Sequence, residues 1–300
     1  MMKIQLNHPG RQKPFTTFTI GKGYVKIGNN IIREWNNDCV HYRKFIRNNG
    51  YYVNGLDDLK PTPAELFFWG EWEGNSFFNP FPKNDFRKLP NGLHKLFHST
   101  VIRGKQNTDP YIYGESFKYC ACKQKGKLTN LTSNDLILFG TVTPKLNKFY
   151  IDTVFVVKGS DPPSHVQATG AAEYSQVYKE ETLEQLKEYL LTPTIENKKK
   201  VYLSKTWWDD KNYFSFVPCK LSYDNIGFER LFIELDNRTF QFSSNPSGIS
   251  YLTKCSLNSK ELWKEIVKIC LKQGFKLGVK FDEPMLNNCL QDIYDGNGSH

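Results

Sequence analysis

Two tryptophans and two glutamates lie close together at Trp69-Gly70-Glu71-Trp72-Glu73. In an extended strand, Trp69 and both glutamates would point to one face and Trp72 to the other, because side chains alternate. Indole rings stack on bases, and carboxylates accept hydrogen bonds from the amino groups of a base edge. The pattern predicts an aromatic pocket that recognises a base, including a modified one. Its candidate residues are Trp69, Glu71, Trp72, Glu73, Asn75 and Ser76.

Two other interpretations of this segment stay open. In the first, the tryptophans belong to the core and the glutamates to the surface, which is common for these residue types. In the second, Glu71 and Glu73 are catalytic carboxylates of a metal-dependent nuclease or nucleotide hydrolase, with a further acid such as Asp85 or Glu115. The chain has no familiar nucleophile, Walker or dinucleotide motif, so the sequence does not decide whether it is an enzyme.

The segment 41–47 alternates cations with aromatic side chains. Its cations, Arg43, Lys44 and Arg47, are suited to phosphate contacts, which carry affinity and make it salt-dependent. The alternative is a half-buried amphipathic element with a basic outer face.

Four residues are the candidates for a metal site: His94, His98, Cys120 and Cys122. The two histidines would share a face on a helix, but a zinc site needs all four ligands to converge. The cysteines are separated by one residue instead of the usual two. We therefore predict no metal and no cofactor.

The positive charge is concentrated in the first part of the chain. The formal net charge is +9, from 40 basic and 31 acidic residues. Residues 1–130 hold 20 basic and 10 acidic residues, whereas residues 131–300 hold 20 and 21. This asymmetry favours a polyanion, namely DNA, RNA or a nucleotide, as the partner.

The sequence has no long apolar run of the kind that spans a membrane, and residues 1–10 lack a signal-peptide core. Its seven cysteines are irregularly spaced, which is typical of free thiols. We predict a cytoplasmic protein with no membrane partner.

Strands should position most of these residues, because aromatic residues form 15% of the chain and favour strands. The clearest strand pair is 136–140 with 149–157, and Asn48-Asn49-Gly50 is typical of a hairpin tip. Helices are expected at 181–191 and 259–273, followed by a strand at 275–281. The prediction is a β-rich α+β fold with a basic region at 1–160 and an α+β lobe at 165–297.

The stretch 128–140, with its polar Asn134-Asp135 corner, and the strand 149–157 resemble the central hairpin of PUA-like domains, including the EVE, ASCH and YTH branches. The usual corner in that superfamily is Gly-Asp. The resemblance implies a small β-barrel that binds RNA or modified bases, often in an aromatic cage. The chain also looks similar to uncharacterised bacterial proteins associated with nucleic-acid modification or phage defence.

The hypothesis drawn from the sequence is a nucleic-acid or nucleotide-binding module that recognises a modified base. The alternatives are the metal-dependent nuclease or nucleotide hydrolase, and a scaffold whose C-terminal lobe contacts a protein partner.

Overall fold

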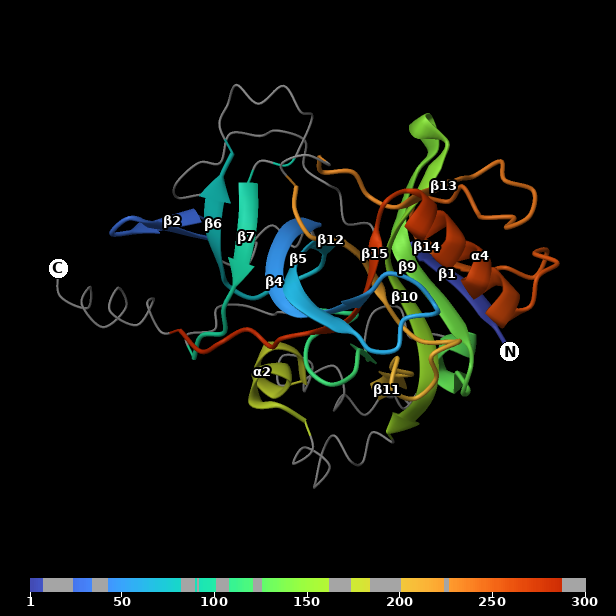
Figure 1. Cartoon of the computed structure of the whole chain (residues 1–300), viewed down its shortest axis with the longest axis horizontal. Coiled ribbons are helices and arrows are strands. Elements are labelled where there is room, and N and C mark those ends of the chain that lie inside the picture. Colours follow the sequence, from blue (N-terminus) through green and yellow to red (C-terminus); the bar gives the residue numbers. More distant parts are fainter. Residues whose placement is uncertain are drawn as a thin grey trace.

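The computed structural model shows two β-sheets and a long helix, α4 (Figure 1). The residues that it describes are 1–7, 24–33, 43–81, 90, 92–100, 108–120, 126–161, 174–183, 201–223 and 227–287. The helical elements are η1 (Gly126–Asn130), η2 (Pro144–Leu146), α2 (Gln176–Tyr178), the π-helical turn η4 (Lys179–Leu183) and α4 (Ser259–Lys272). The strands are β1 (Lys3–Asn7), β2 (Tyr24–Ile27), β3 (Asn30–Arg33), β4 (Lys44–Val53), β5 (Thr62–Gly70), β6 (Ser76–Pro80), β7 (Gly92–Leu96), β8 (Lys118–Tyr119), β9 (Leu136–Thr143), β10 (Lys148–Asp161), β11 (Val201–Ser204), β12 (Val217–Lys220), β13 (Phe232–Glu234), β14 (Gly248–Tyr251) and β15 (Lys276–Phe281).

One sheet closes partly on itself. Its strand order is β15-β12-β5-β4-β7-β6-β3-β2, and β15 also pairs with β4. The additional pairing joins β4, β5, β12 and β15 into a small closed barrel of four strands. Strands β7, β6, β3 and β2 extend from β4 as an open part, on the left of Figure 1. The predicted β-rich α+β fold with a small barrel is confirmed at this level.

A glycine allows the barrel to close. The sequence predicts a hairpin tip at Asn48-Asn49-Gly50, but β4 runs through these residues without a turn. A β-carbon on Gly50 would lie 2.3 Å from the backbone oxygen of Lys280. Two backbones approach this closely only where one residue has no side chain. The hairpin prediction is wrong because this glycine serves the crossing of β4 and β15.

The second sheet contains the predicted strand pair. Its order is β14-β1-β9-β10-β11-β8, with β13 paired to β10 off this path. The pair predicted at 136–140 and 149–157 is confirmed as the antiparallel β9 and β10. Strand β1 lies parallel to β9, with Ile4 opposite Ile137. The hairpin therefore lies inside this sheet and not in the four-stranded barrel, contrary to the expected position.

Both sheets combine strands from the two predicted regions, 1–160 and 165–297. The barrel takes β4 and β5 from the first and β12 and β15 from the second. The other sheet takes β1, β9 and most of β10 from the first and β11, β13 and β14 from the second. A strand edge must find hydrogen-bond partners, and distance along the chain does not limit which strand supplies them. The predicted boundary therefore does not divide the sheets.

The helix predicted at 259–273 is confirmed as α4, and the strand after it as β15. Asn258 and Glu261 form a capping box that satisfies backbone donors of the first turn. The apolar face of α4, which includes Leu262 and Trp263, packs in the core between α4 and the sheets. That face is therefore used within the chain, so it is not available to dock a partner.

Residues 176–183 are covered by α2 and η4. The helix predicted at 181–191 lies outside the described residues from position 184 onward. Among the described residues, no helix is both long enough and apolar enough to cross a membrane.

Candidate functional site

The two tryptophans of the predicted pocket are core residues. Trp69 is 5% exposed and donates its indole N–H to the backbone oxygen of Phe228 at 2.8 Å. Trp72 is 1% exposed and donates to the backbone oxygen of Asn75 at 2.9 Å. They pack in different hydrophobic clusters, as the alternation along an extended chain requires. An open pocket between them is therefore absent from the described structure, and the core interpretation is the one that fits.

One predicted carboxylate, Glu71, and one predicted cation, Arg43, belong to a buried network instead. The Arg43 guanidinium binds Glu71 and, through Nε at 2.6 Å, Asp152 on β10. Arg230 binds the other oxygen of Asp152 at 2.5 Å. We call these four residues the paired cluster. All are buried, and two arginines face two carboxylates, so the charges balance.

A bulge in β10 directs Asp152 into the paired cluster. The register of β10 against β9 shifts between Ile151 and Thr153, which makes Asp152 the extra residue. Such bulges redirect one side chain away from the regular alternation of the strand. The paired cluster thus joins β4 of one sheet to β10 of the other. The sequence had predicted that Arg43 contacts a phosphate. The structure instead buries it in the paired cluster, where its role is structural.

The other two predicted phosphate ligands differ in accessibility. The Lys44 ammonium donates to the backbone oxygens of Trp72 and Gly74, so it stabilises the chain after β5. Arg47 is exposed and forms an ion pair with Glu65 at 2.5 Å. Both members of that pair are more than 40% exposed, so solvent screens it strongly. Of the three predicted cations, Arg47 alone is open to a ligand.

Arg47 lines an open groove on the extension of the barrel sheet. The groove has a volume of about 300 Å³. Lys95 on β7 pairs directly with Arg47 on β4, and Phe77 on β6 pairs with Lys95 on its other side. Paired residues of neighbouring strands share one face, so two cations and a ring stand side by side. The full lining is Asn29, Asn30, Ile31, Arg47, Phe77, Phe78, Asn79, Pro80, Leu93 and Lys95.

The two histidines do not converge on a common site. His94 lies on β7, where its Nδ1 is 2.9 Å from the Ser76 hydroxyl. His98 lies between two glutamates, with Nε2 2.7 Å from Glu180 and Nδ1 2.8 Å from Glu181. Cys120 is buried, and Cys122 lies outside the described residues. In the described part of the chain, no three His, Cys, Asp or Glu residues are placed to hold a metal ion.

The surroundings of the His98 imidazole raise its pKa and so favour the charged form. Burial alone would lower the pKa of His98, but the hydrogen bonds and charges of Glu181 and Glu180 outweigh burial and raise it. Burial raises the pKa of Glu181, against the opposing effect of His98. His98 therefore fastens the end of β7 to η4 through charge-assisted hydrogen bonds.

A second buried cluster lies nearby, between α2, β8 and the chain after β15. It consists of Tyr111, Tyr113, Lys118, Tyr178 and Glu283, and we call it the tyrosine cluster. The rings of Tyr111 and Tyr178 are 4.8 Å apart, and those of Tyr111 and Tyr113 are 5.3 Å apart. The hydroxyl of Tyr113 is buried and makes no hydrogen bond with the described residues. A buried polar group left in this way costs about 1–3 kcal/mol.

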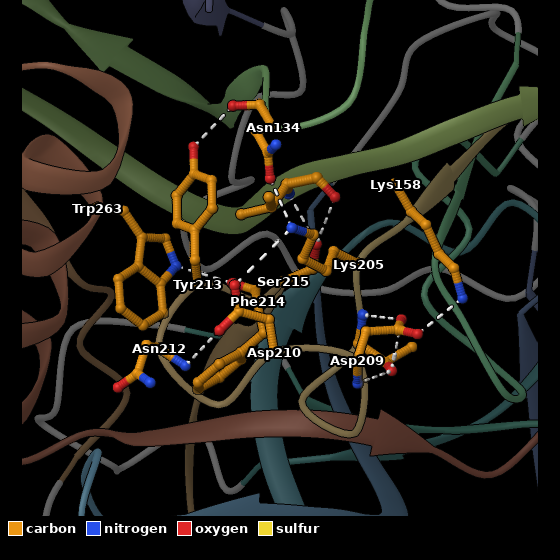
Figure 2. Close-up of polar contacts among 12 residues, drawn as sticks. Asn134, Lys158, Lys205, Asp209, Asp210, Asn212, Tyr213, Phe214, Ser215 and Trp263 are labelled. Atoms are coloured by element: carbon orange, nitrogen blue, oxygen red, sulfur yellow. Dashed lines mark hydrogen bonds and ion pairs between the residues drawn. The ribbon is translucent and has the colours of Figure 1, made fainter.

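Asn134 of the predicted corner belongs to a dense network of polar contacts with Lys205 and Tyr213, shown in Figure 2. Asn134 has a φ of 72°, a left-handed conformation that asparagine tolerates. Its side-chain oxygen accepts from Lys205 at 2.5 Å, and its backbone oxygen accepts from the Tyr213 hydroxyl at 2.9 Å (Figure 2). The members of this network bond to one another, so we assign it to the stability of the β9–β10 hairpin.

The sequence pointed to Arg47 but not to its neighbours in the groove or to Lys118. Lys95 has a visible signal, since it is a single cation within the apolar strand 92–96. Lys118 has none, because Tyr178 and Glu283, which complete its surroundings, come from distant segments of the chain. No family model, curated protein or solved structure matches this chain.

Proposed function

We propose that the protein binds a strand of nucleic acid in the groove between β2–β3 and β4. The observation that supports this most directly is the side-by-side placement of Arg47 and Lys95 on an exposed face. Like charges at paired positions repel each other and lower stability. Lys95 makes no hydrogen bond or ion pair with the described residues, so Glu65 offsets only the charge of Arg47. A phosphate between the two cations would remove the repulsion.

The other residues of the groove suit the rest of a nucleotide. Asn29, Asn30 and Asn79 are exposed, and amide side chains both donate to and accept from base edges. Phe77 is partly exposed beside Lys95, and an aromatic ring stacks on any base. The excess of basic over acidic residues in 1–130 adds long-range attraction for a polyanion.

Binding of labelled single strands of DNA and RNA, followed by fluorescence anisotropy over a salt series, tests this proposal. The double variant Arg47→Ala/Lys95→Ala is expected to weaken binding about tenfold or more and to reduce the salt slope by about two. Lys145→Ala/Lys268→Ala is the matched control, since it removes two exposed cations outside the groove. Equal losses in the two double variants would show that the groove is not the binding site.

A change of opposite sign sharpens the test. Glu65→Gln removes the carboxylate that competes with a phosphate for Arg47. We expect this variant to bind nucleic acid a few-fold more tightly at low salt, with the gain lost as salt rises. Unchanged or weaker binding would contradict the role of Arg47.

The present geometry gives less support to the metal-dependent nuclease. Glu71, its first carboxylate, is engaged by Arg43 in the paired cluster. Binding is therefore the function that we propose. PUA-like ancestry and recognition of a modified base remain predictions from the sequence.

A further inference from the structure

The buried amine of Lys118 lies in an unusual environment for a lysine. Lys118 is 7% exposed, and its ammonium nitrogen lies 5.3 Å from the centre of the Tyr111 ring and 5.1 Å from that of Tyr178. Backbone hydrogen bonds join Lys118 and Tyr111 in both directions, which fixes the two side chains next to each other. The tyrosine cluster therefore encloses an amine between aromatic walls.

Hydrogen bonding does not support a charged amine at this position. An ammonium has three donors, and Lys118 uses one, to the backbone oxygen of Ser116 at 3.1 Å. Within the described residues it forms no other hydrogen bond and no ion pair. A buried charge with two unused donors is costly, whereas a neutral amine is not. Burial accordingly lowers the pKa of Lys118 to about 8, although Glu283 and Glu115 oppose the shift.

One of the two rings that flank the amine, that of Tyr111, carries a hydroxyl that is hydrogen-bonded to a carboxylate. The Tyr111 hydroxyl donates to Glu283 at 3.2 Å, and Ser175 donates to the same carboxylate oxygen. Burial and the charge of Glu283 raise the pKa of Tyr111, so its hydroxyl keeps the proton. The hydroxyl of Tyr113, on the neighbouring ring, is buried and makes no hydrogen bond with the described residues.

We propose that Lys118 is a nucleophilic lysine that condenses reversibly with a small uncharged aldehyde or ketone. The amine lone pair attacks the carbonyl carbon, and the carbonyl oxygen takes a proton to give a carbinolamine. Loss of that oxygen as water, with the second proton of the amine, leaves an imine. Tyr111 is the group placed to exchange the proton with the oxygen. An uncharged ligand is favoured because Glu283 would repel an anion.

Reductive trapping in the native protein tests the proposal. The protein is treated with propanal and cyanoborohydride at about pH 7, and propylated lysines are located by peptide mass spectrometry. Exposed lysines are almost fully protonated at this pH, so Lys118 should be labelled about tenfold faster than Lys268, which is 70% exposed. The proposal is overturned if Lys118 is labelled no faster than Lys268, or if Lys118 is labelled only after the protein has been unfolded.

Lys220 is the matched control for burial. It is 3% exposed and lies over Phe275, a ring without a hydroxyl. We expect Lys118 to react about tenfold faster than Lys220, because Phe275, the ring that Lys220 lies over, carries no hydroxyl. Equal rates at the two buried lysines would mean that burial alone explains the reactivity and would overturn the proposal.

Tyr111→Phe removes the hydroxyl and leaves the Lys118 amine in place, so it tests the contribution of the proton donor by itself. This variant should slow the trapping of Lys118 severalfold, while the midpoint of the rate-against-pH curve stays near that of the parent. An unchanged trapping rate would remove Tyr111 from the reaction. Far-UV and near-UV circular dichroism of the same sample checks that the variant is folded.

Discussion

The paired cluster and the tyrosine cluster are both buried and both contain opposite charges, yet they are built in opposite ways. In the paired cluster, Asp152 receives a guanidinium on each oxygen, and two arginines balance two carboxylates. In the tyrosine cluster, Lys118 has one hydrogen bond, and Tyr113 has none with described residues. A polar group whose bonds are complete stabilises the fold, whereas one left incomplete is held there at a cost.

The comparison indicates which cluster serves the architecture. The paired cluster joins β4 to β10 and so fixes one sheet against the other. The tyrosine cluster keeps unused hydrogen-bonding capacity, which is expected where a ligand completes the bonds. Replacing Asp152 in the paired cluster should therefore lower stability, whereas replacing Lys118 or Tyr113, whose hydrogen bonds are incomplete, should leave it unchanged or raise it.

The largest effect is expected for Asp152→Ala. This change leaves Arg230 with a buried, unpaired charge and removes one of the two partners of Arg43. The free energy of unfolding should fall by about 3–5 kcal/mol, measured by urea unfolding. Lys158→Ala breaks an exposed ion pair with Asp209 and should cost less than about 1 kcal/mol. Similar losses in the two variants would contradict the structural role of the paired cluster.

A smaller loss is expected for His98→Gln, and it should depend on pH. The pKa of His98 is raised in the folded state, so its stabilising contacts are complete below the unfolded value of 6.5. Their contribution is lost as pH rises through the folded pKa. The stability gap between parent and variant should be about 1–2 kcal/mol near pH 6 and should narrow at higher pH. A gap that widens with pH would show that His98 is buried in its neutral form.

Lys118→Met should shift stability in the opposite direction. The folded pKa of Lys118 is about 8 against an ordinary value of 10.5, so the burial penalty is complete below pH 8. Between these values the unfolded chain binds more protons, and the stability of the parent rises with pH. The variant should be about 1–2 kcal/mol more stable than the parent near pH 7, with the gap closing towards pH 10. A gap that stays constant over this range would contradict a lowered pKa for Lys118.

The smallest effect separates two neighbouring tyrosines. Tyr113→Phe removes a hydroxyl that bonds to none of the described residues, so stability should stay the same or rise by up to about 1 kcal/mol. Tyr111→Phe removes a hydrogen bond to Glu283 and should cost about 1 kcal/mol. Thermal unfolding of the two variants in one buffer makes the comparison. A loss at Tyr113 as large as that at Tyr111 would mean that its hydroxyl is satisfied within the chain.

Local patterns predicted the elements that depend on local physics. The capping residues Asn258 and Glu261 fixed the start of α4, and the density of β-branched and aromatic residues identified β9 and β10. Gly50 shows where such patterns fail. Glycine marks both a turn and a close approach of two strands, and the approaching strand β15 lies more than two hundred residues later. No local signal distinguishes the two uses.

For the candidate site residues, too, local patterns predicted some features and missed those that depend on distant parts of the chain. The sequence predicted phosphate contacts for both Arg43 and Arg47 and base stacking for Trp69, but the structure buries Arg43 and Trp69 and leaves Arg47 exposed. A cation and an aromatic ring are equally suited to a ligand and to a core, so residue type does not separate the two uses. Lys95, Phe77 and the asparagines of the groove became neighbours of Arg47 through strand pairing.

The sequence by itself determined the β-rich composition, the hairpin β9–β10, the capped helix α4 and the excess of positive charge in residues 1–130. These properties depend on side-chain type and on spacing of a few residues. Only the tertiary structure decided the closure of the barrel, the burial of Arg43 and the isolation of the Lys118 amine. Each of these depends on segments that are far apart in the chain and come together in the fold. Their packing determines which side chains are buried, and burial in turn sets the charge and reactivity of those side chains.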